Sequence, residues 1–274
     1  MGKIPDQSQF VLDAKGIFYL CFGFISTAVL IGIFHSGIQN LLGVNLLNHK
    51  WIFLILNALT IGFPIITFWY FYLKPQKKTL GLDFKFCSGK DFIIILPMMF
   101  GMILIAEAFG NFIPTEGEVW GDWFDSFQKQ MDFISQDQLV MYLMVVVLAP
   151  ILEEILFRGI VLKGLIHKGV LPNNAIFISS LVFAIIHANP WQFVGALLLG
   201  MVLGLVYFKT KSIVTVIVLH ALNNLFSMLI MLYTHADNLY EILGVSSFTA
   251  LALGIVLFWV FYTLFNKEQQ EISR

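Results

Sequence analysis

The sequence predicts an all-α protein, a polytopic membrane helix bundle with about eight transmembrane helices. Of its 274 residues, 58% are hydrophobic and 12% are charged, and the mean hydropathy is +0.84. A soluble domain carries about 25% charged residues. The apolar residues also gather in long runs, and about 20 apolar residues form a helix that crosses the hydrocarbon core of a bilayer. Short polar connectors separate most of these runs.

Eight apolar runs approach this length, and none is separated from the next by a Ser/Gly-rich linker or a repeat. The predicted spans are residues 16–35, 51–73, 92–111, 139–160, 174–190, 192–208, 212–233 and 246–265. We therefore expect a single transmembrane domain over residues 1–274. The first run lacks a small-residue cleavage site and is predicted to be retained as a span. The acidic, Trp-containing connector 112–138 is predicted to hold an amphipathic interfacial helix, because Trp favours the membrane surface.

The distribution of basic residues predicts the orientation, because cytoplasmic loops are enriched in Lys and Arg. With both termini in the cytoplasm, 14 of the 16 basic residues fall on the cytoplasmic side, and Lys50 and Lys129 fall outside. We therefore expect a multi-pass protein of a cell membrane with cytoplasmic termini. The Lys-, Ile- and Phe-rich composition suggests a bacterial source.

Composition also narrows the partners. The net charge of −1 gives no reason to expect nucleic-acid binding. Cys21 and Cys87 form neither a CxxC metal pattern nor a disulfide framework. The expected partners are the lipid bilayer and a membrane-associated peptide or protein.

The fourth predicted span contains two adjacent carboxylates, Glu153 and Glu154, and a basic residue, Arg158. A charged side chain near the centre of a bilayer costs roughly several kcal/mol, so the presence of three requires a specific reason. Glu154 and Arg158 are four residues apart and share a helix face, so they can form an ion pair. Glu153 points to another face about 100° away. Burial and its neighbour favour the neutral form of Glu153, which suits a general acid or base.

Two later spans carry His187, and His220 with Asn224. The helical rise of about 1.5 Å per residue places His187 roughly 20 Å from the cytoplasmic start of its span. Glu153 lies at a similar depth if the fourth helix continues to about Ile166, and Asn224 does so in its own helix. We therefore expect these groups to meet at one level within the membrane.

Structural explanations exist for each residue taken alone. An intramembrane His often makes a helix–helix hydrogen bond, and Glu154 with Arg158 forms a plausible structural pair. Gly200 and Gly204 form a GxxxG pattern, which indicates close helix packing. Six polar side chains in three spans at matching depth nevertheless favour a buried hydrolytic site over scaffolding.

Three ordered motifs carry a family resemblance: Glu153-Glu154-x-x-x-Arg158, Phe183-x-x-x-His187 and His220-x-x-x-Asn224. They resemble the motifs of the CPBP family (CAAX protease and bacteriocin-processing, also Abi or type II CAAX-protease-like) of intramembrane endopeptidases. The match covers roughly residues 145–225, where we place the catalytic core.

The resemblance implies peptide-bond hydrolysis in the membrane plane and a catalytic role for each of these polar residues. Glu153 and His187 would activate water, with Glu153 as general base. Glu154, held by Arg158, would shape the site, and His220 and Asn224 would stabilise the oxyanion.

The resemblance leaves open whether a metal ion takes part in the reaction. Zinc or another divalent ion, if present, would be held by His187, His220 and Glu153, since three protein ligands and an open position define a catalytic zinc site. The chain has no HExxH pattern, however, and Arg158 already offsets one carboxylate, so we favour metal-free catalysis.

Two other function classes fit part of the pattern. One is a non-catalytic bacteriocin self-immunity or partner-binding membrane protein. The other is an ion- or proton-coupled transporter, because intramembrane Glu, His and Arg also build proton relays. Many transporters contain inverted repeats, and the two halves of this sequence show none, which argues against the transporter hypothesis.

Overall fold

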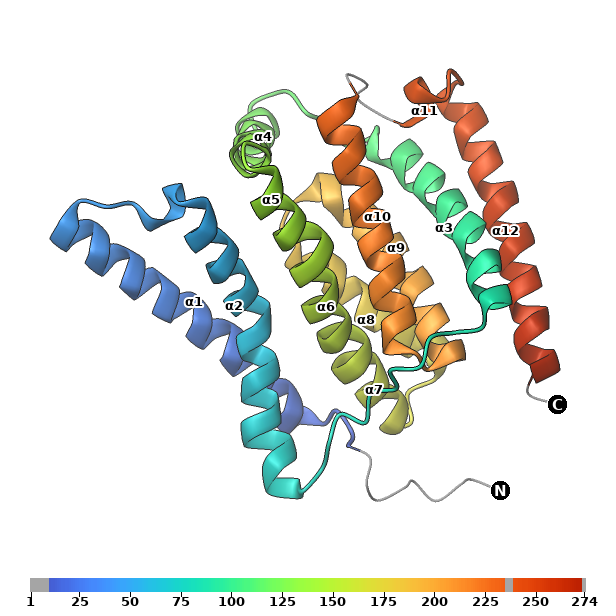
Figure 1. Ribbon diagram of the computed structural model, residues 1–274, viewed down its shortest axis with the longest axis horizontal. Coiled ribbons are helices and arrows are strands. Elements are labelled where there is room, and N and C mark those ends of the chain that lie inside the picture. The colour runs from blue at the N-terminus through green and yellow to red at the C-terminus, as the bar shows by residue number, and fades with distance from the viewer. Residues whose placement is uncertain (1–9, 235–238, 273–274) are drawn as a thin grey trace. The chain divides into compact units, whose positions relative to one another are not determined.

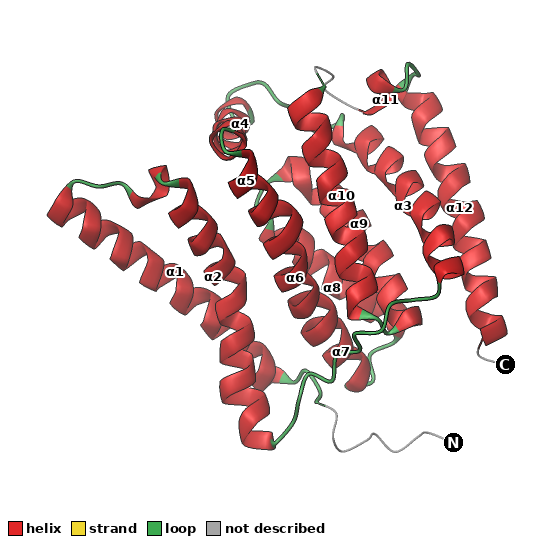
Figure 2. Ribbon diagram, in the orientation of Figure 1, coloured by secondary structure: helices red, strands yellow, loops and turns green. Residues whose placement is uncertain are grey.

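The computed structural model describes residues 10–234 and 239–272. Every regular element in these residues is a helix, and they contain no strand (Figure 2). Within these described residues, seven helices are long and apolar enough to cross a membrane: Ala14–Leu42, Lys50–Gln76, Gly89–Gly110, Gln138–His167, Pro190–Thr210, Ile213–Tyr233 and Ser247–Gln269. The prediction of an all-α polytopic bundle is confirmed. Helices dominate because a bilayer offers no water to satisfy exposed backbone groups.

The eighth apolar helix, α8 (Pro172–Ile186), is shorter than predicted. The predicted span 174–190 is wrong at its end, because the helix stops four residues earlier. Asn189 precedes a proline, which disfavours the helical conformation, and it adopts an extended one with φ −141° and ψ 142°. Ala188 has a positive φ of 53°. His187 therefore lies in the turn after α8, not inside it.

The chain divides into two compact units, each built from two stretches of sequence. Unit 1 comprises residues up to Leu82 and Asp132–Ala175, and unit 2 comprises Asp83–Met131 and the residues from Ile176 onward. The single transmembrane domain expected over residues 1–274 stays a prediction.

In unit 1, α1 (Ala14–Leu42) and α2 (Lys50–Phe68) form an antiparallel pair (Figure 1). They approach closely at Gly23, where an added Cβ would lie 2.6 Å from the Cα of Pro64. The hydroxyl of Thr67 also donates a 3.2 Å hydrogen bond to the carbonyl of Tyr19. Small residues allow this approach, which is a common way to pack helices in membranes.

The third helix of unit 1 runs without interruption from Gln138 to His167 and comprises α5 (Gln138–Met141), α6 (Ala149–Glu154) and α7 (Lys163–His167) (Figure 1). The segment before α1 holds its α7 end. The Leu12 amide donates to the Gly164 carbonyl at 3.0 Å, and the ring Nδ1 of His167 donates to the Phe10 carbonyl at 2.9 Å. This helix contains the fourth predicted span, and it continues past Ile166 to His167, as the estimate of the depth of Glu153 required.

In unit 2, α3 (Gly89–Gly110) lies beside α12 (Ser247–Ile272) (Figure 1). A Cβ at Gly101 would lie 2.8 Å from the carbonyl oxygen of Gly254, and a Cβ at Gly254 would lie 2.8 Å from that of Gly101. The two backbones therefore touch at a pair of glycines. A short helix, α11 (Leu239–Ile242), precedes α12.

The remaining helices of unit 2 carry the second and third motifs. They are α9 (Pro190–Thr210), α10 (Ile213–Tyr233) and most of α8, while α4 (Gly121–Ser135) begins in the same unit. The predicted helix in the connector 112–138 is confirmed as α4. The GxxxG prediction is also confirmed, because Gly200 lies against Ser180 and Gly204 against Ile176 of α8.

Candidate active site

The first motif lies in a helix with two π-helical stretches, Tyr142–Leu148 and Ile155–Leu162. Pro150 follows the first stretch; a proline lacks an N–H and crowds the carbonyl four residues earlier. Wider π turns are one way in which membrane helices absorb this disturbance. Glu153 and Glu154 occupy the short α-helical turn between the two stretches. Single π turns inside α-helices occur frequently at functional sites.

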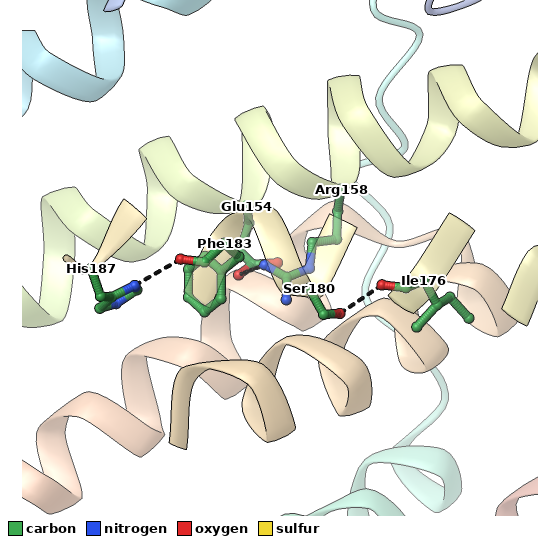
Figure 3. A network of polar contacts seen from close by, with 6 residues as sticks. All are labelled: Glu154, Arg158, Ile176, Ser180, Phe183 and His187. Atoms are coloured by element: carbon green, nitrogen blue, oxygen red, sulfur yellow. Dashed lines mark hydrogen bonds and ion pairs between the residues drawn. The ribbon is translucent and has the colours of Figure 1, made fainter. Parts of the chain in front are cut away.

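Glu154 and Arg158 form a buried ion pair, as the spacing predicts. Nη1 of Arg158 donates to Oε1 of Glu154 at 2.7 Å, and the two side chains are 1% and 0% exposed (Figure 3). Each charge offsets the desolvation cost of the other. Glu153 is half-buried and also interacts electrostatically with Arg158. One guanidinium therefore interacts with two carboxylates.

The second motif fixes the ring of His187. Nδ1 of His187 lies 2.8 Å from the carbonyl oxygen of Phe183, one turn earlier (Figure 3). A carbonyl oxygen can only accept a hydrogen bond, so Nδ1 carries the hydrogen. In the neutral ring, Nε2 then keeps its lone pair. Such a backbone contact is a common way to set the tautomer of a catalytic or metal-binding histidine.

The ring of Phe183 brings the second and third motifs together. It contacts the His187 ring edge-to-face at a centroid distance of 4.8 Å and the His220 ring at 5.7 Å. Phe183 and His220 are buried, and His187 is half-buried. Both imidazoles therefore border one aromatic ring, as expected for residues of one site.

Asn224 follows His220 by one turn of α10, so both project from one face of this helix. The side-chain amide of Asn223 donates to the Asn224 side-chain oxygen at 3.2 Å. Asn223 was not among the predicted site residues, although the sequence repeats Asn at positions 223 and 224.

The six predicted site residues fall in different units. Glu153, Glu154 and Arg158 lie in unit 1, whereas His187, His220 and Asn224 lie in unit 2. The structure pairs Glu154 with Arg158 and brings His187 and His220 to Phe183. The meeting of Glu153 with the two histidines stays a prediction.

A protein site holds a metal ion with several donor side chains placed close together. In residues 10–234 and 239–272, no three His, Cys, Asp or Glu side chains are grouped closely enough to hold one ion. The suggested set of His187, His220 and Glu153 stays a prediction, because Glu153 lies in unit 1 and the two histidines lie in unit 2.

Unit 1 provides a half-buried carboxylate, and unit 2 provides an imidazole with a defined lone pair and side-chain amides. Both units contain membrane-length helices. Such groups are those that peptide hydrolysis requires. The fold and these groups together describe a multi-pass membrane protein with a candidate hydrolytic site.

Part of the chain is similar to a known protein family. Residues 135–226 match the family model described as Type II CAAX prenyl endopeptidase Rce1-like. The matched segment runs from the end of α4 into α10 and contains all three motifs. It confirms the resemblance drawn from the motifs and supports a CAAX-type intramembrane endopeptidase in general terms. No curated protein and no solved structure matched the chain.

Proposed function

We propose that the protein is an intramembrane endopeptidase that hydrolyses a peptide bond of a membrane-associated peptide or protein. One observation carries the proposal furthest: the Phe183 carbonyl sets the tautomer of His187 while the Phe183 ring contacts both His187 and His220. The family match supports the same reaction class.

In the proposed mechanism, Glu153 and His187 hold the attacking water. The water oxygen bonds to the scissile carbonyl carbon while its proton passes to the Glu153 carboxylate, and the carbonyl becomes an oxyanion. His220 and Asn224 donate to this oxyanion, and donors aimed at developing charge are commonly worth about 3–4 kcal/mol each. The C–N bond then breaks as the proton passes from Glu153 to the leaving amine.

Glu154 and Arg158 have a supporting role in this proposal. Their ion pair keeps one of the two carboxylates ionised and hydrogen-bonded, which leaves the other to exchange protons. Two carboxylates in different environments are a common basis for acid–base assignments.

The test is cleavage by protein purified into lipid nanodiscs. The substrates are a C-terminal CAAX peptide with its cysteine prenylated, the same peptide without the prenyl group, and a library of membrane-spanning peptides. Wild type should cleave at least one of these, and Glu153→Gln and His187→Ala should cleave none. Glu118→Gln, which changes an exposed connector carboxylate, is the matched control and should keep wild-type activity.

Cleavage assays with and without a metal chelator distinguish metal-free hydrolysis from metal-dependent hydrolysis. Metal-free hydrolysis predicts unchanged rates after chelation. Loss with chelator and recovery with added zinc would contradict the metal-free form. If Glu153→Gln retains activity, the proposed general base is wrong. If wild type cleaves no substrate but confers bacteriocin immunity that both variants retain, the binding alternative holds instead.

We also propose that the protein lies in a cell membrane of a bacterium with both termini in the cytoplasm. The basic residues support this orientation, although Lys3 and Arg274 lie outside the described residues. Termini on the same side require an even number of spans, so α8 must cross the membrane as the eighth. Its 15 residues extend about 22 Å, which makes it a short span. Labelling single cysteines introduced near each terminus with a membrane-impermeant reagent tests it: labelling of intact cells at either terminus would contradict it.

A further inference from the structure

The turn that carries His187 is followed by Trp191, whose side chain contacts α4. Trp191 is the second residue of α9, four residues after His187. Its ring centroid lies 5.0 Å from that of Phe124 and 5.9 Å from that of Phe127, with which it stacks nearly parallel. Its Nε1–H donates to the Pro114 carbonyl at 3.2 Å. Further ring contacts join Trp191 to Trp120 and Trp123.

All of these residues lie in unit 2, and they come from three separate parts of the chain. The hydrogen bond reaches the connector before α4, the ring contacts reach α4 itself, and the backbone of Trp191 opens α9. Aromatic pairs in these geometries attract beyond their area of contact. The start of α9 is thus fixed from two directions.

The Ala188 amide donates to the Ile185 carbonyl at 3.0 Å, but two other hydrogen bonds of the turn are long. The His187 amide donates to the Ala184 carbonyl at 3.3 Å, and the Asn189 side chain donates to the His187 carbonyl at 3.4 Å. Both distances exceed the usual range. Ala188 adopts a positive φ of 53°, which is strained for a residue with a Cβ. The surrounding structure must therefore hold this conformation.

The link from Trp191 to His187 is short and stiff. Pro190 fixes its own φ, and Asn189 caps α9 by accepting the Gln192 amide at 2.8 Å. The Asn189 side chain also donates to the Gln192 side-chain oxygen at 2.6 Å. A displacement of the first turn of α9 is therefore transmitted to Ala188 and His187.

We propose that Trp191 is a positioning residue for His187: its attachment to α4 keeps the turn in the conformation that gives His187 its Nδ1–H tautomer. The consequence for catalysis rests on the proposed function. The effect of Trp191 on the His187 tautomer is independent of the proposed function, because it concerns a hydrogen bond that exists without substrate.

The experiment is nitrogen-15 NMR of histidine-labelled protein in lipid bilayers. Nδ1–H and Nε2–H imidazoles have different nitrogen shifts, and the His187 signals are those missing from His187→Asn protein. Wild type should show the Nδ1–H tautomer. Trp191→Ala should convert it into a mixture, whereas Trp191→Phe, which keeps the ring contacts, should retain it.

A matched control and a second variant separate positioning from general damage. Trp259→Ala removes a Trp of α12 that is 65% exposed, and it should leave the His187 signals unchanged. Trp123→Ala weakens the same attachment from α4 and should reproduce the mixture with little change in thermal unfolding. An unchanged Nδ1–H tautomer in both Trp191→Ala and Trp123→Ala would overturn the proposal; if Trp191→Ala fails to fold, Trp123→Ala decides alone.

Cleavage kinetics add a second readout where a substrate is known. Displacing a catalytic group by about 1 Å can cost roughly a hundredfold in rate, so Trp191→Ala should lower kcat by about ten- to a hundredfold. KM should stay within about twofold, because the change affects the reacting group and not ground-state binding. If the protein cleaves nothing, the NMR result still tests the positioning of His187.

Discussion

Arg158 donates a 2.7 Å hydrogen bond to Glu154, and neither side chain is accessible to solvent beyond 1%. The pair joins successive turns of one helix, so it forms within a single element of unit 1. Removing one partner of a buried ion pair destabilises a protein far more than replacing both partners with uncharged residues.

Arg158→Met should lower the free energy of unfolding by about 3–5 kcal/mol, because it leaves the Glu154 carboxylate buried without its guanidinium. The double variant Glu154→Gln with Arg158→Met should recover most of this loss. Thermal unfolding followed by circular dichroism in detergent measures both. Lys90→Met is the control, because its pair with Glu268 is solvent-exposed on the Lys90 side and should contribute about 0–1 kcal/mol. A double variant no more stable than Arg158→Met would contradict this account.

Phe183→Leu should lower cleavage activity without unfolding the protein. The substitution keeps an apolar side chain but removes the ring that contacts both His187 and His220. The lost aromatic contacts are worth about 0.5–1.5 kcal/mol each, so the melting temperature should fall by a few degrees while kcat falls more strongly. Phe177→Leu changes a residue of α8 that is 48% exposed, so it serves as the control and should match wild type. Equal kcat in all three proteins would show that the Phe183 ring does not organise the site.

Gly200→Ala should destabilise the protein by about 1–3 kcal/mol, because overpacking forces neighbouring atoms to shift. Its Cβ would lie 2.9 Å from the Cβ and 3.1 Å from the Cα of Ser180 on α8. Gly195→Ala changes the same helix where nothing lies within 4 Å, and it should be neutral or stabilising. Thermal unfolding of the two variants compares them directly, and equal destabilisation would argue against a specific α8–α9 contact.

Cys87 should react slowly with iodoacetamide at neutral pH. Burial raises the pKa of its thiol above the ordinary value of 9.0, and the Asp91 carboxylate adds to this effect. Since the thiolate is the reactive form, the alkylation rate should keep rising as pH increases past 9. The measurement uses Cys21→Ser protein, so that Cys87 is the remaining thiol, with a short cysteine peptide as reference. A rate that levels off at lower pH than that of the peptide would contradict the raised pKa.

The sequence predicted the parts of this protein that depend on local spacing. Hydropathy located the spans because each membrane helix must satisfy its own backbone and bury an apolar surface. The Glu154–Arg158 pair followed from a separation of four residues on one helix. The close packing at Gly200 followed from the GxxxG pattern, and the connector helix from its amphipathic, Trp-containing sequence.

The end of α8 was predictable in principle and was missed. Asn189 and Pro190 form a stop signal that outweighs the hydropathy of the run 174–190, because the residue before a proline avoids the helical conformation. The error placed His187 inside a span, whereas it lies in a turn.

The sequence by itself determined the membrane helices, their approximate limits and the candidate polar residues, because these depend on interactions within one helix or between a helix and the bilayer. The tertiary structure decided that one phenylalanine ring contacts two histidines and that Trp191 attaches the His187 turn to α4. These contacts join residues on different elements, and only the packing of those elements fixes which side chains meet.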